Sequence, residues 1–147
     1  MDLITYKKAL LKYQPIETMT AGLELVGSEV KSLRAKLGSL EGSRVVVRGG
    51  EAFIAGMTIP PYQAANTPKG YDPERPRRLL LTKQEILELA STESKKGLTV
   101  VPLSVYNYKG LIKARIAIVR GKGKEDRRED LKKREAEREA GRLLKNR

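Results

Sequence analysis

Residues 44–55 have the sequence Arg44-Val45-Val46-Val47-Arg48-Gly49-Gly50-Glu51-Ala52-Phe53-Ile54-Ala55. Two apolar runs, rich in β-branched and aromatic side chains, flank a pair of glycines. Because glycine adopts positive φ without a steric cost, Gly49-Gly50 suits a two-residue turn between antiparallel strands. The stretch therefore predicts a β-hairpin and indicates a fold built mainly from strands.

Further strands are expected on both sides of this hairpin. One runs near residues 16–26, and two more run over residues 98–106 and 111–119. Alternation along the last strand directs Lys113 and Arg115 outward. The side chains predicted to share one face are Val101, Leu103 and Val105 in the strand at 98–106, and those predicted to point inward are Ile112, Ala114, Ile116 and Ile118.

Two short helices complete the expected body. One runs from Glu29 to Lys36 and is closed by Gly38, and the other begins at Thr82. Thr82 and Glu85 have the spacing of a capping box. With about five or six strands and no βαβ repeat, the body is predicted to be mainly β with short helices. A small closed antiparallel β-barrel, OB-like, over residues 1–119 fits best.

The composition excludes several kinds of chemistry. The chain has 147 residues, no Cys, no His and a net charge of +12. Disulfides, thiolate metal sites and Ser-His-Asp relays are therefore impossible. Residues 1–15 lack a signal-peptide core, and no apolar run reaches the roughly 18–20 residues of a membrane span. We expect a soluble, cytoplasmic protein with no membrane partner, whose charge binds nucleic acid.

The positive charge falls into two parts. Residues 120–147 hold 12 basic and 7 acidic side chains, net +5, which leaves 18 and 11, net +7, for residues 1–119. The tail has too few large apolar residues to offset its ordering entropy. Its composition favours a basic tail that is disordered when free and helical when held by a partner. A solvated helix packed on the body, or a tail that serves only solubility, are the alternatives.

Several motifs resemble those of one protein family. The run Gly27-Ser28-Glu29-Val30-Lys31-Ser32-Leu33-Arg34 resembles the G-[TS]-E-V-K-S-L-R signature of SmpB, the SsrA (tmRNA)-binding family of bacteria. Other motifs of the family are matched in order at residues 50–53, 72–81, 97–103 and 120–128. The resemblance extends from Tyr6 to about Leu144, which is nearly the whole chain.

The resemblance implies an RNA-binding adaptor in trans-translation, not an enzyme, with no cofactor and no metal. In this family the barrel binds the tRNA-like domain of tmRNA, and the complex reaches a stalled ribosome with elongation factor Tu, which it contacts through tmRNA. The tail then occupies the empty mRNA channel at the small-subunit decoding centre. We expect this chain to act in the same way, as a monomer.

The residues argue against two other functions. A general ribosome-associated or single-stranded RNA-binding barrel would need exposed stacking aromatics, and the single Phe and six Tyr do not cluster in the sequence. A magnesium-dependent nuclease would need clustered carboxylates, and the acidic residues of the body show no such spacing.

The candidate RNA-binding residues match family motifs or protrude from expected strands. They are Lys7, Lys8, Lys12, Tyr13, Thr20, Glu29, Lys31, Arg34, Leu80, Thr82, Lys113, Arg115, Arg120, Lys122 and Lys124. Most have a second interpretation. The N-terminal lysines could form a solvated arm, and Lys113 and Arg115 could belong to an ordinary polar strand face.

Three further alternatives concern single elements. Glu29, Lys31 and Arg34 could equally be a charged helix face. For Thr82 we favour the N-cap over RNA contact. The charged residues of a long proline-rich loop at residues 59–78 could order that loop through ion pairs, or its arginines could touch RNA. They are Asp72, Arg75, Arg77 and Arg78.

A few positions depart from the family pattern. Tyr6 replaces an Asn, Thr20 an acidic residue, Thr82 an Asn or His, Gly123 a Lys, and Glu125 a His or Tyr. A carboxylate stacks poorly on a base and repels phosphate, so neighbouring arginines must compensate or decoding-centre engagement differs here. The tail residues expected to contact the ribosome are Glu125, Asp126, Arg127, Arg128, Lys132, Lys133, Arg134 and Arg138.

Overall fold

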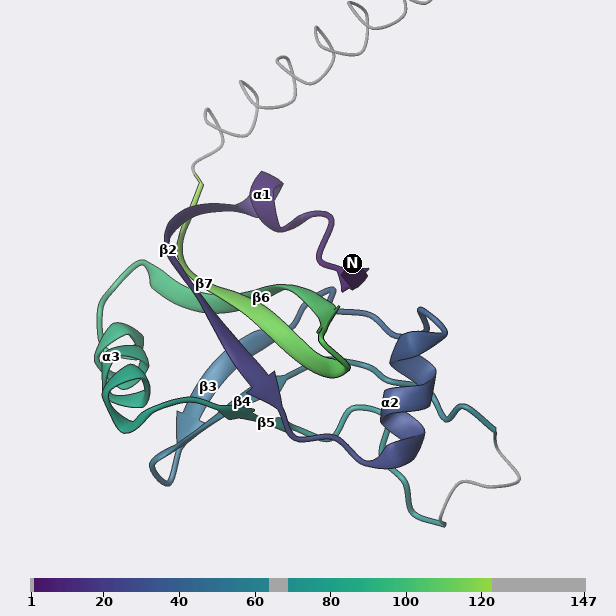
Figure 1. The fold of residues 1–147 in the computed structure, drawn as a ribbon. Coiled ribbons are helices and arrows are strands. Elements are labelled where there is room, and N and C mark those ends of the chain that lie inside the picture. The colour runs from purple at the N-terminus through teal and green to yellow at the C-terminus, as the bar shows by residue number, and fades with distance from the viewer. Residues whose placement is uncertain (1, 64–68, 123–147) are drawn as a thin grey trace, which may run out of the picture.

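The computed structural model describes residues 2–63 and 69–122. Within them lie seven strands and three short helices (Figure 1). The strands are β1 (Asp2–Thr5), β2 (Tyr13–Leu23), β3 (Arg44–Arg48), β4 (Glu51–Ala55), β5 (Arg77–Leu80), β6 (Leu98–Tyr108) and β7 (Leu111–Gly121). The helices are α1 (Ala9–Lys12), α2 (Gly27–Arg34) and α3 (Lys83–Glu93). The mainly β class with short helices is confirmed.

The hairpin predicted at residues 44–55 is confirmed. β3 and β4 pair in antiparallel register from Arg44↔Ala55 to Arg48↔Glu51, which leaves a two-residue turn. Gly49 and Gly50 have φ values of 59° and 77°, the left-handed conformation that suits glycine. The sequence therefore located both strands and their register from the turn residues alone.

All seven strands form one antiparallel sheet in the order β1-β6-β7-β2-β5-β4-β3. The predicted closed barrel is wrong on closure, because β1 and β3 are the ends and no ladder joins them in the described part of the chain. The sheet does curl, so that β3 contacts β6, and α3 contacts both strands. The Glu93 carboxylate of α3 accepts the Val47 N–H at 2.8 Å. A helix side chain thus satisfies an edge group that a closing strand would have paired.

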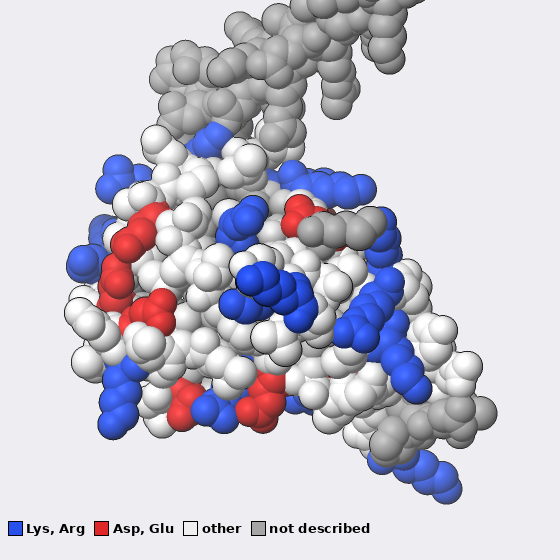
Figure 2. All heavy atoms as spheres, viewed as in Figure 1, with Lys and Arg blue, Asp and Glu red and all other residues white. Residues whose placement is uncertain are grey.

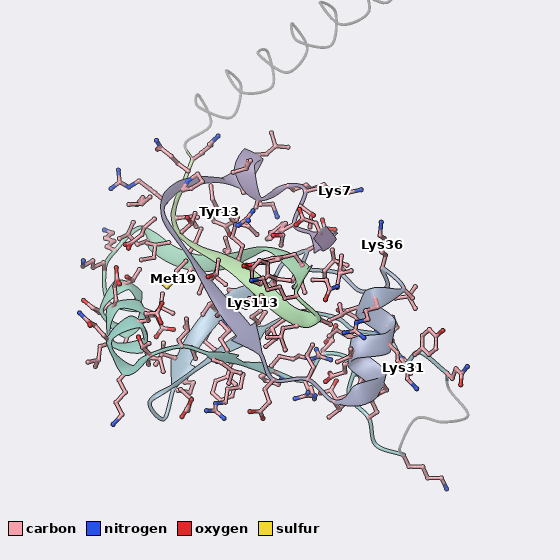
Figure 3. The ribbon with its side chains drawn as sticks, viewed as in Figure 1. Lys7, Tyr13, Met19, Lys31, Lys36 and Lys113 are labelled. Carbon is pink, nitrogen blue, oxygen red and sulfur yellow. The ribbon has the colours of Figure 1, made fainter. Side chains whose placement is uncertain are left out.

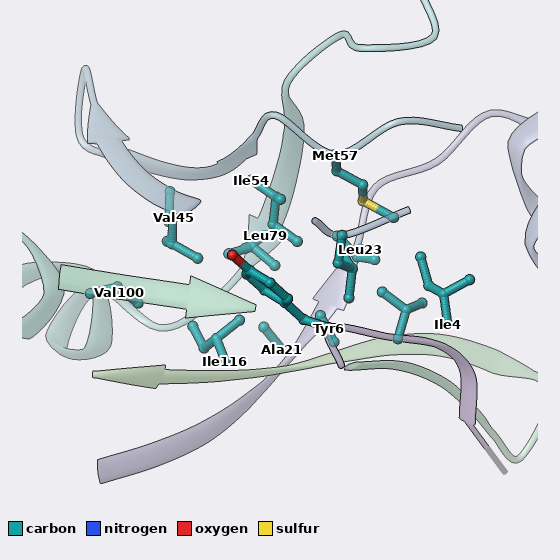
Figure 4. Packing of buried hydrophobic residues seen from close by; sticks show 14 of the residues in the cluster. Ile4, Tyr6, Ala21, Leu23, Val45, Ile54, Met57, Leu79, Val100 and Ile116 are labelled. Carbon is teal, nitrogen blue, oxygen red and sulfur yellow. The ribbon is translucent and has the colours of Figure 1, made fainter. Parts of the chain in front are cut away.

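The core lies between the curled strands and the two longer helices (Figure 4). The four β7 residues predicted to point inward all belong to it. The shared face predicted for β6 is wrong: Val105 joins the main core, whereas Val101 packs with Ala117 and Val119 in a second cluster. A register shift between Pro102 and Ser104 changes the side-chain phase, as a β-bulge does.

Two elements near the N-terminus were not expected from the sequence. β1 pairs with β6, and α1 connects it to β2. Tyr6, between them, is 5% exposed, and its N–H donates to the Leu103 carbonyl at 2.8 Å. β7 continues to Gly121, and the Lys122 N–H donates to the Lys12 carbonyl at 2.9 Å. The strand predicted to end at residue 119 is therefore two residues longer than expected.

Candidate nucleic-acid interface

The outer face of β2, β7 and β6 carries the best candidate site. Strand register places Thr20 of β2 beside Arg115 of β7, and Gly22 beside Lys113. On the other side of β7, Tyr106 of β6 lies opposite Lys113. Arg115 is exposed, and Figure 3 shows Lys113 near the centre of this face. Register thus brings together three of the predicted site residues: Thr20, Lys113 and Arg115.

Two tyrosines hold the cations on this face. The guanidinium carbon of Arg115 lies 5.5 Å from the centroid of the Tyr106 ring. The Nζ atoms of Lys113 and Lys109 each lie 5.3 Å from the centroid of the Tyr108 ring. Such cation–π contacts leave the charged groups accessible while restricting where they lie. The face therefore offers fixed positive charges beside aromatic rings, the combination used to bind a phosphate backbone and its bases.

A shallow pocket of about 260 Å³ opens beside these cations. Its lining combines apolar side chains with the basic residues Arg34 and Lys113. Leu80 and Leu111, in the lining, are 49% and 62% exposed. The register Gly22↔Leu80 places β5 next to β2, so Leu80 borders the outer face. Of the predicted site residues, Leu80 and Arg34 therefore join Lys113 at this pocket.

Charge is unevenly distributed over the molecule. Figure 2 shows lysines and arginines at the centre of this face and along the α2 side, whereas acidic residues gather near α3 and along the lower edge. Glu17 of β2 and Glu88 of α3 belong to the acidic side, and hydrogen bonding and repulsion between their carboxyl groups raise the pKa of Glu88. A polyanion would therefore be steered to the strand face and α2 and away from α3.

The N-terminal candidates lie at the edge of the sheet. Lys7 and Lys8 line a cavity of about 480 Å³ with Lys36, which follows α2. Lys8 also pairs with Glu41 at 3.5 Å, and both side chains are largely exposed. Lys12 is exposed at the end of α1. Tyr13 is half-buried and packs on the second apolar cluster, which gives it a structural role.

Glu29 does not fit the predicted RNA contact. Its side chain is fully buried, and both carboxylate oxygens are bound within the protein. Arg77 donates to Oε2 from Nε at 2.8 Å and from Nη2 at 2.6 Å. Arg75 donates to both oxygens, and the Val26 N–H donates to Oε1 at 2.9 Å. We therefore remove Glu29 from the candidate interface and assign it to the structure of the loop.

This cluster fixes the proline-rich loop. Arg77, also fully buried, donates from Nη1 to the carbonyls of Met57 and Pro73, each at 2.8 Å. The Tyr71 hydroxyl donates to the Ile59 carbonyl at 2.8 Å. Burial raises the pKa of Glu29, but hydrogen bonds from Arg75, Val26 and Arg77 outweigh it, so that the pKa lies below its ordinary value. Ion pairs thus hold the described part of this loop at residues 71–77, which agrees with one of the two predictions for its charged residues.

Arg78 and Asp72, the other two of the four charged residues predicted to order the loop, also have partners within the protein. Arg78 donates to Glu51 and to Glu24, each at 2.9 Å, and these bonds raise the pKa of Arg78. Asp72 accepts the Glu74 N–H at 2.9 Å in a local turn. Because both residues have partners within the protein, their presence in the loop is explained without a contact to RNA.

Thr82 forms the predicted N-cap of α3. Its hydroxyl accepts the Glu85 N–H at 3.2 Å, and the Glu85 carboxylate accepts the Thr82 N–H at 2.9 Å. Lys31 is exposed on α2 (Figure 3). Arg120 is exposed at the end of β7, and Lys122 follows that strand. Lys124 and all eight predicted ribosome-contacting residues, from Glu125 to Arg138, lie outside the described residues.

Sequence reasoning missed the aromatic part of the interface. Tyr106 and Tyr108 lie two residues apart on one strand and so share a face, yet they were not predicted to cluster. The sequence does contain a signal for this. Tyr106 and Tyr108 occupy every second position of one strand, and Lys113 and Arg115 occupy every second position of the strand that pairs with it. Reading it requires the tight turn at Lys109-Gly110, whereas a four-residue loop was expected there.

In the described part of the chain, no group of three or more His, Cys, Asp or Glu residues is arranged to hold a metal ion. Among residues 2–63 and 69–122, no helix combines the length and the hydropathy of a membrane span.

The comparisons with known proteins agree with one another. The profile of the SmpB protein family matches residues 3–146. The SsrA-binding protein of Thermosipho africanus is 45% identical over 142 residues, which cover 96% of this chain and 95% of that protein. The SsrA-binding protein of Solidesulfovibrio magneticus is 48% identical over 138 residues, covering 94% and 89%.

A solved structure has the same fold. It is described as "tmRNA-SmpB: a journey to the center of the bacterial ribosome", and its matching chain is 37% identical with a TM-score of 0.67. The match covers 86% of this chain and 92% of that one. Family profile, relatives and structure thus cover nearly the whole sequence, and the chain belongs to the SmpB family of SsrA-binding proteins.

Proposed function

We propose that this protein binds the tRNA-like domain of tmRNA and delivers it to stalled ribosomes for trans-translation. The membership of the chain in the SmpB family and the tmRNA–SmpB structure similar to it support this function. The arrangement of cations and tyrosines on the outer strand face is the observation that indicates which residues bind the RNA. Arg115 and Lys113, held beside Tyr106 and Tyr108, would contact the RNA, with Leu80 and Arg34 at the neighbouring pocket.

The other parts of the proposal follow from the same family resemblance. The tail, residues 120–147, acts as a separate unit that occupies the mRNA channel near the decoding centre. The protein works as a monomer in the cytoplasm, where ribosomes are found, and meets elongation factor Tu through tmRNA. It is an adaptor, and no step of a reaction is assigned to it.

Binding by the strand face is tested by gel shift with the tRNA-like domain of tmRNA. Lys113→Ala/Arg115→Ala should weaken binding about 10-fold or more, since both cations would leave the phosphates they neutralise. The matched control is Lys95→Ala/Lys96→Ala, two exposed lysines that follow α3 on the acidic side. Equal affinity of the strand-face variant and the wild type would remove this face from the proposal.

The proposed role of the tail is tested separately on stalled ribosomes. Residues 1–122 alone should bind the tRNA-like domain as the full chain does, yet fail to support peptide tagging. Glu125→His in the full chain should tag at least as well as the wild type, because an imidazole stacks on a base better than a carboxylate. Normal tagging by residues 1–122 would refute the tail mechanism.

One observation favours a second function, general binding of single-stranded RNA. Tyr106 and Tyr108 present rings on the same strand face, and Tyr108 is 49% exposed. Stacking on such rings is tolerant of sequence. Competition by an unrelated single-stranded RNA of equal length decides between the two: efficient competition favours the general function, and poor competition favours tmRNA.

A further inference from the structure

Two lysines adopt a backbone conformation that other residue types adopt at lower cost. Lys36 and Lys109 have φ values of 61° and 49°, and they are the only non-glycine residues at positive φ within residues 2–63 and 69–122. In this left-handed region the Cβ atom of an L-residue lies too close to the backbone. Strain of this kind persists where another requirement outweighs it, so both positions call for an explanation.

Lys36 closes α2 at a position where glycine is the usual residue. The Leu37 N–H donates to the Ser32 carbonyl at 2.9 Å, and the Lys36 N–H donates to the Leu33 carbonyl at 2.8 Å. These two bonds define a Schellman motif with Lys36 as its left-handed residue, a role that glycine fills most often. Helix termination therefore explains the conformation of Lys36 but not the choice of lysine.

Lys109 occupies the first position of the β6–β7 turn. The pairing Tyr108↔Leu111 leaves Lys109 and Gly110 as a two-residue turn, and both have positive φ. Asn-Gly and Gly-Gly are favoured in such a turn. The chain itself uses Gly49-Gly50 for the same turn between β3 and β4. Turn formation, too, does not explain why a lysine stands at position 109.

The fold brings the end of α2 into contact with the β6–β7 turn, and each lysine stands next to this contact in the sequence. The Arg34 guanidinium, at the end of α2, donates to the Gly110 carbonyl at 3.1 Å and so ties the helix to the turn. Lys36 lies two residues after Arg34 in the sequence, and Lys109 lies directly before Gly110. The Nζ atoms of Lys109 and Lys113 both lie over the Tyr108 ring. We name this group of four cations, Arg34, Lys36, Lys109 and Lys113, the α2–turn cluster.

The α2–turn cluster is positively charged without local compensation. None of its four members forms an ion pair with a carboxylate of the described residues, whereas Arg48, Arg75, Arg77 and Arg78 each pair with at least one glutamate. Lys36 and Lys109 are both exposed. Several unpaired cations in one small area repel one another in the free protein, and an anion with closely spaced charges would relieve that repulsion.

We propose that Lys36 and Lys109 bind backbone phosphates of the RNA that lies on the outer strand face, one on each side of the Arg34–Gly110 contact, and that their left-handed backbone is retained for this purpose. The proposal rests on the proposed function, which supplies the RNA. Arg34 and Lys113 connect the two lysines to the pocket and strand face already described. The cluster thus extends that interface around the end of the sheet onto α2, a direction that Figure 3 shows from Lys113 to Lys36.

The test uses substitutions that remove charge and strain together. Lys36→Gly and Lys109→Asn, in the full chain, each supply a residue suited to the left-handed conformation. Each should raise Tm by about 1–3 °C, because backbone strain is lost. Each should also weaken binding to the tRNA-like domain about 3- to 10-fold and reduce the slope of log affinity against log salt by about 0.7–0.9.

Opposite changes in stability and affinity separate this role from a merely structural one. Lys96→Gly, an exposed lysine after α3, is the control and should leave affinity within twofold of the wild type. The proposal is overturned if both variants bind within twofold of the wild type with an unchanged salt slope, or if stability and affinity fall together. Wild-type affinity for tmRNA against an unrelated RNA tests the proposed function itself. The affinity of each variant relative to the wild type can be measured with any RNA that the wild type binds, because phosphate contacts are independent of sequence. This measurement therefore tests the role of the two lysines even if the proposed function is wrong.

Discussion

At the residue scale, one motif holds residues in opposite environments. Glu29 and Arg34 stand five positions apart in the run that resembles the family signature, yet Glu29 is fully buried and Arg34 is exposed. Sequence alone left structure and RNA contact equally open for both. The decision required Arg75 and Arg77, which lie 46 and 48 positions from Glu29. No local pattern could supply that contact, because it depends on where the proline-rich loop folds back.

The buried carboxylate of Glu29 should dominate the stability of the loop. Glu29→Gln should lower the free energy of unfolding by about 3–5 kcal/mol, because Arg77 would then be a buried charge without a partner. Urea denaturation at pH 7 measures this. Glu24→Gln, which removes an exposed partner of Arg78, should cost no more than about 1 kcal/mol. A similar small loss for both variants would contradict the assigned role.

The lowered pKa of Glu29 also predicts a pH dependence. Its folded-state pKa lies below the ordinary Glu value of about 4.3. The contribution of the Glu29 carboxylate to the free energy of unfolding is therefore fully present above that value. It is lost as the pH falls below that value and through the folded-state pKa. Wild-type stability should decrease more steeply below about pH 4.3 than that of Glu29→Gln. Parallel curves for the two proteins would show that another carboxyl group is responsible.

The raised pKa of Glu88 has the opposite sign. A hydrogen bond with Glu17, which favours the protonated form, and repulsion between the two carboxylates raise this pKa in the folded state. The resulting penalty in stability is present above the folded-state pKa and is relieved as pH falls. Glu88→Gln should therefore raise Tm at pH 7 and should lose this advantage near pH 4. Glu74→Gln, an exposed carboxylate elsewhere, is the control and should change Tm little at either pH. An equal rise in both variants would indicate a general charge effect.

At the scale of elements, turn and cap residues were the reliable signals. Gly49-Gly50 gave a hairpin with the correct register, and Thr82 gave the start of α3. The same reasoning failed where the signal was weak or non-local. The helix predicted at residues 29–36 begins two residues earlier, at Gly27, and the bulge in β6 reversed a predicted face. A bulge follows from pairing with neighbouring strands, which one strand's alternation does not contain.

The cap of α3 offers a test between two roles of Thr82. Thr82→Ala should cost about 1 kcal/mol, because the Glu85 N–H loses its acceptor. Affinity for the tRNA-like domain should remain within twofold of the wild type. Thr82→Ser keeps a hydroxyl and should restore most of the stability. A loss of affinity in Thr82→Ala at full stability would instead place this residue in the RNA interface.

At the scale of the whole molecule, the sequence correctly predicted the fold class and which side chains of β7 point into the core. It wrongly predicted that the sheet closes into a barrel. Composition and strand count cannot distinguish a closed barrel from a curled open sheet, because the difference lies in whether the end strands pair, and here β3 contacts β6 and α3 without a ladder to another strand at that edge. The candidate site shows the same division. Lys113 and Arg115 were found from alternation, but Tyr106, Tyr108 and the α2–turn cluster required the register and the turn.

The extent of the ordered body gives a prediction at this scale. Residues 1–122 should unfold with the same Tm as the full chain within about 2 °C, since the core lies inside that range. Residues 1–119 should be less stable by about 1–3 kcal/mol, because Gly121 and Arg120 pair with β2 and Leu98 pairs with Arg120. Equal stability of the two shortened chains would place the end of the body at residue 119.

The unpaired outer edge of β3 has a consequence for how the molecule opens. β2, β7 and β6 pair along ten or so residues each, whereas β3 has one strand neighbour and a single carboxylate, Glu93, at its other edge. Amide protons of β3 should therefore exchange with solvent through a local opening that leaves β2 and β7 closed. The RNA-facing strands would then form the slowest-exchanging part of the protein. Hydrogen exchange followed by NMR would reveal this difference as two separate groups of protected amides.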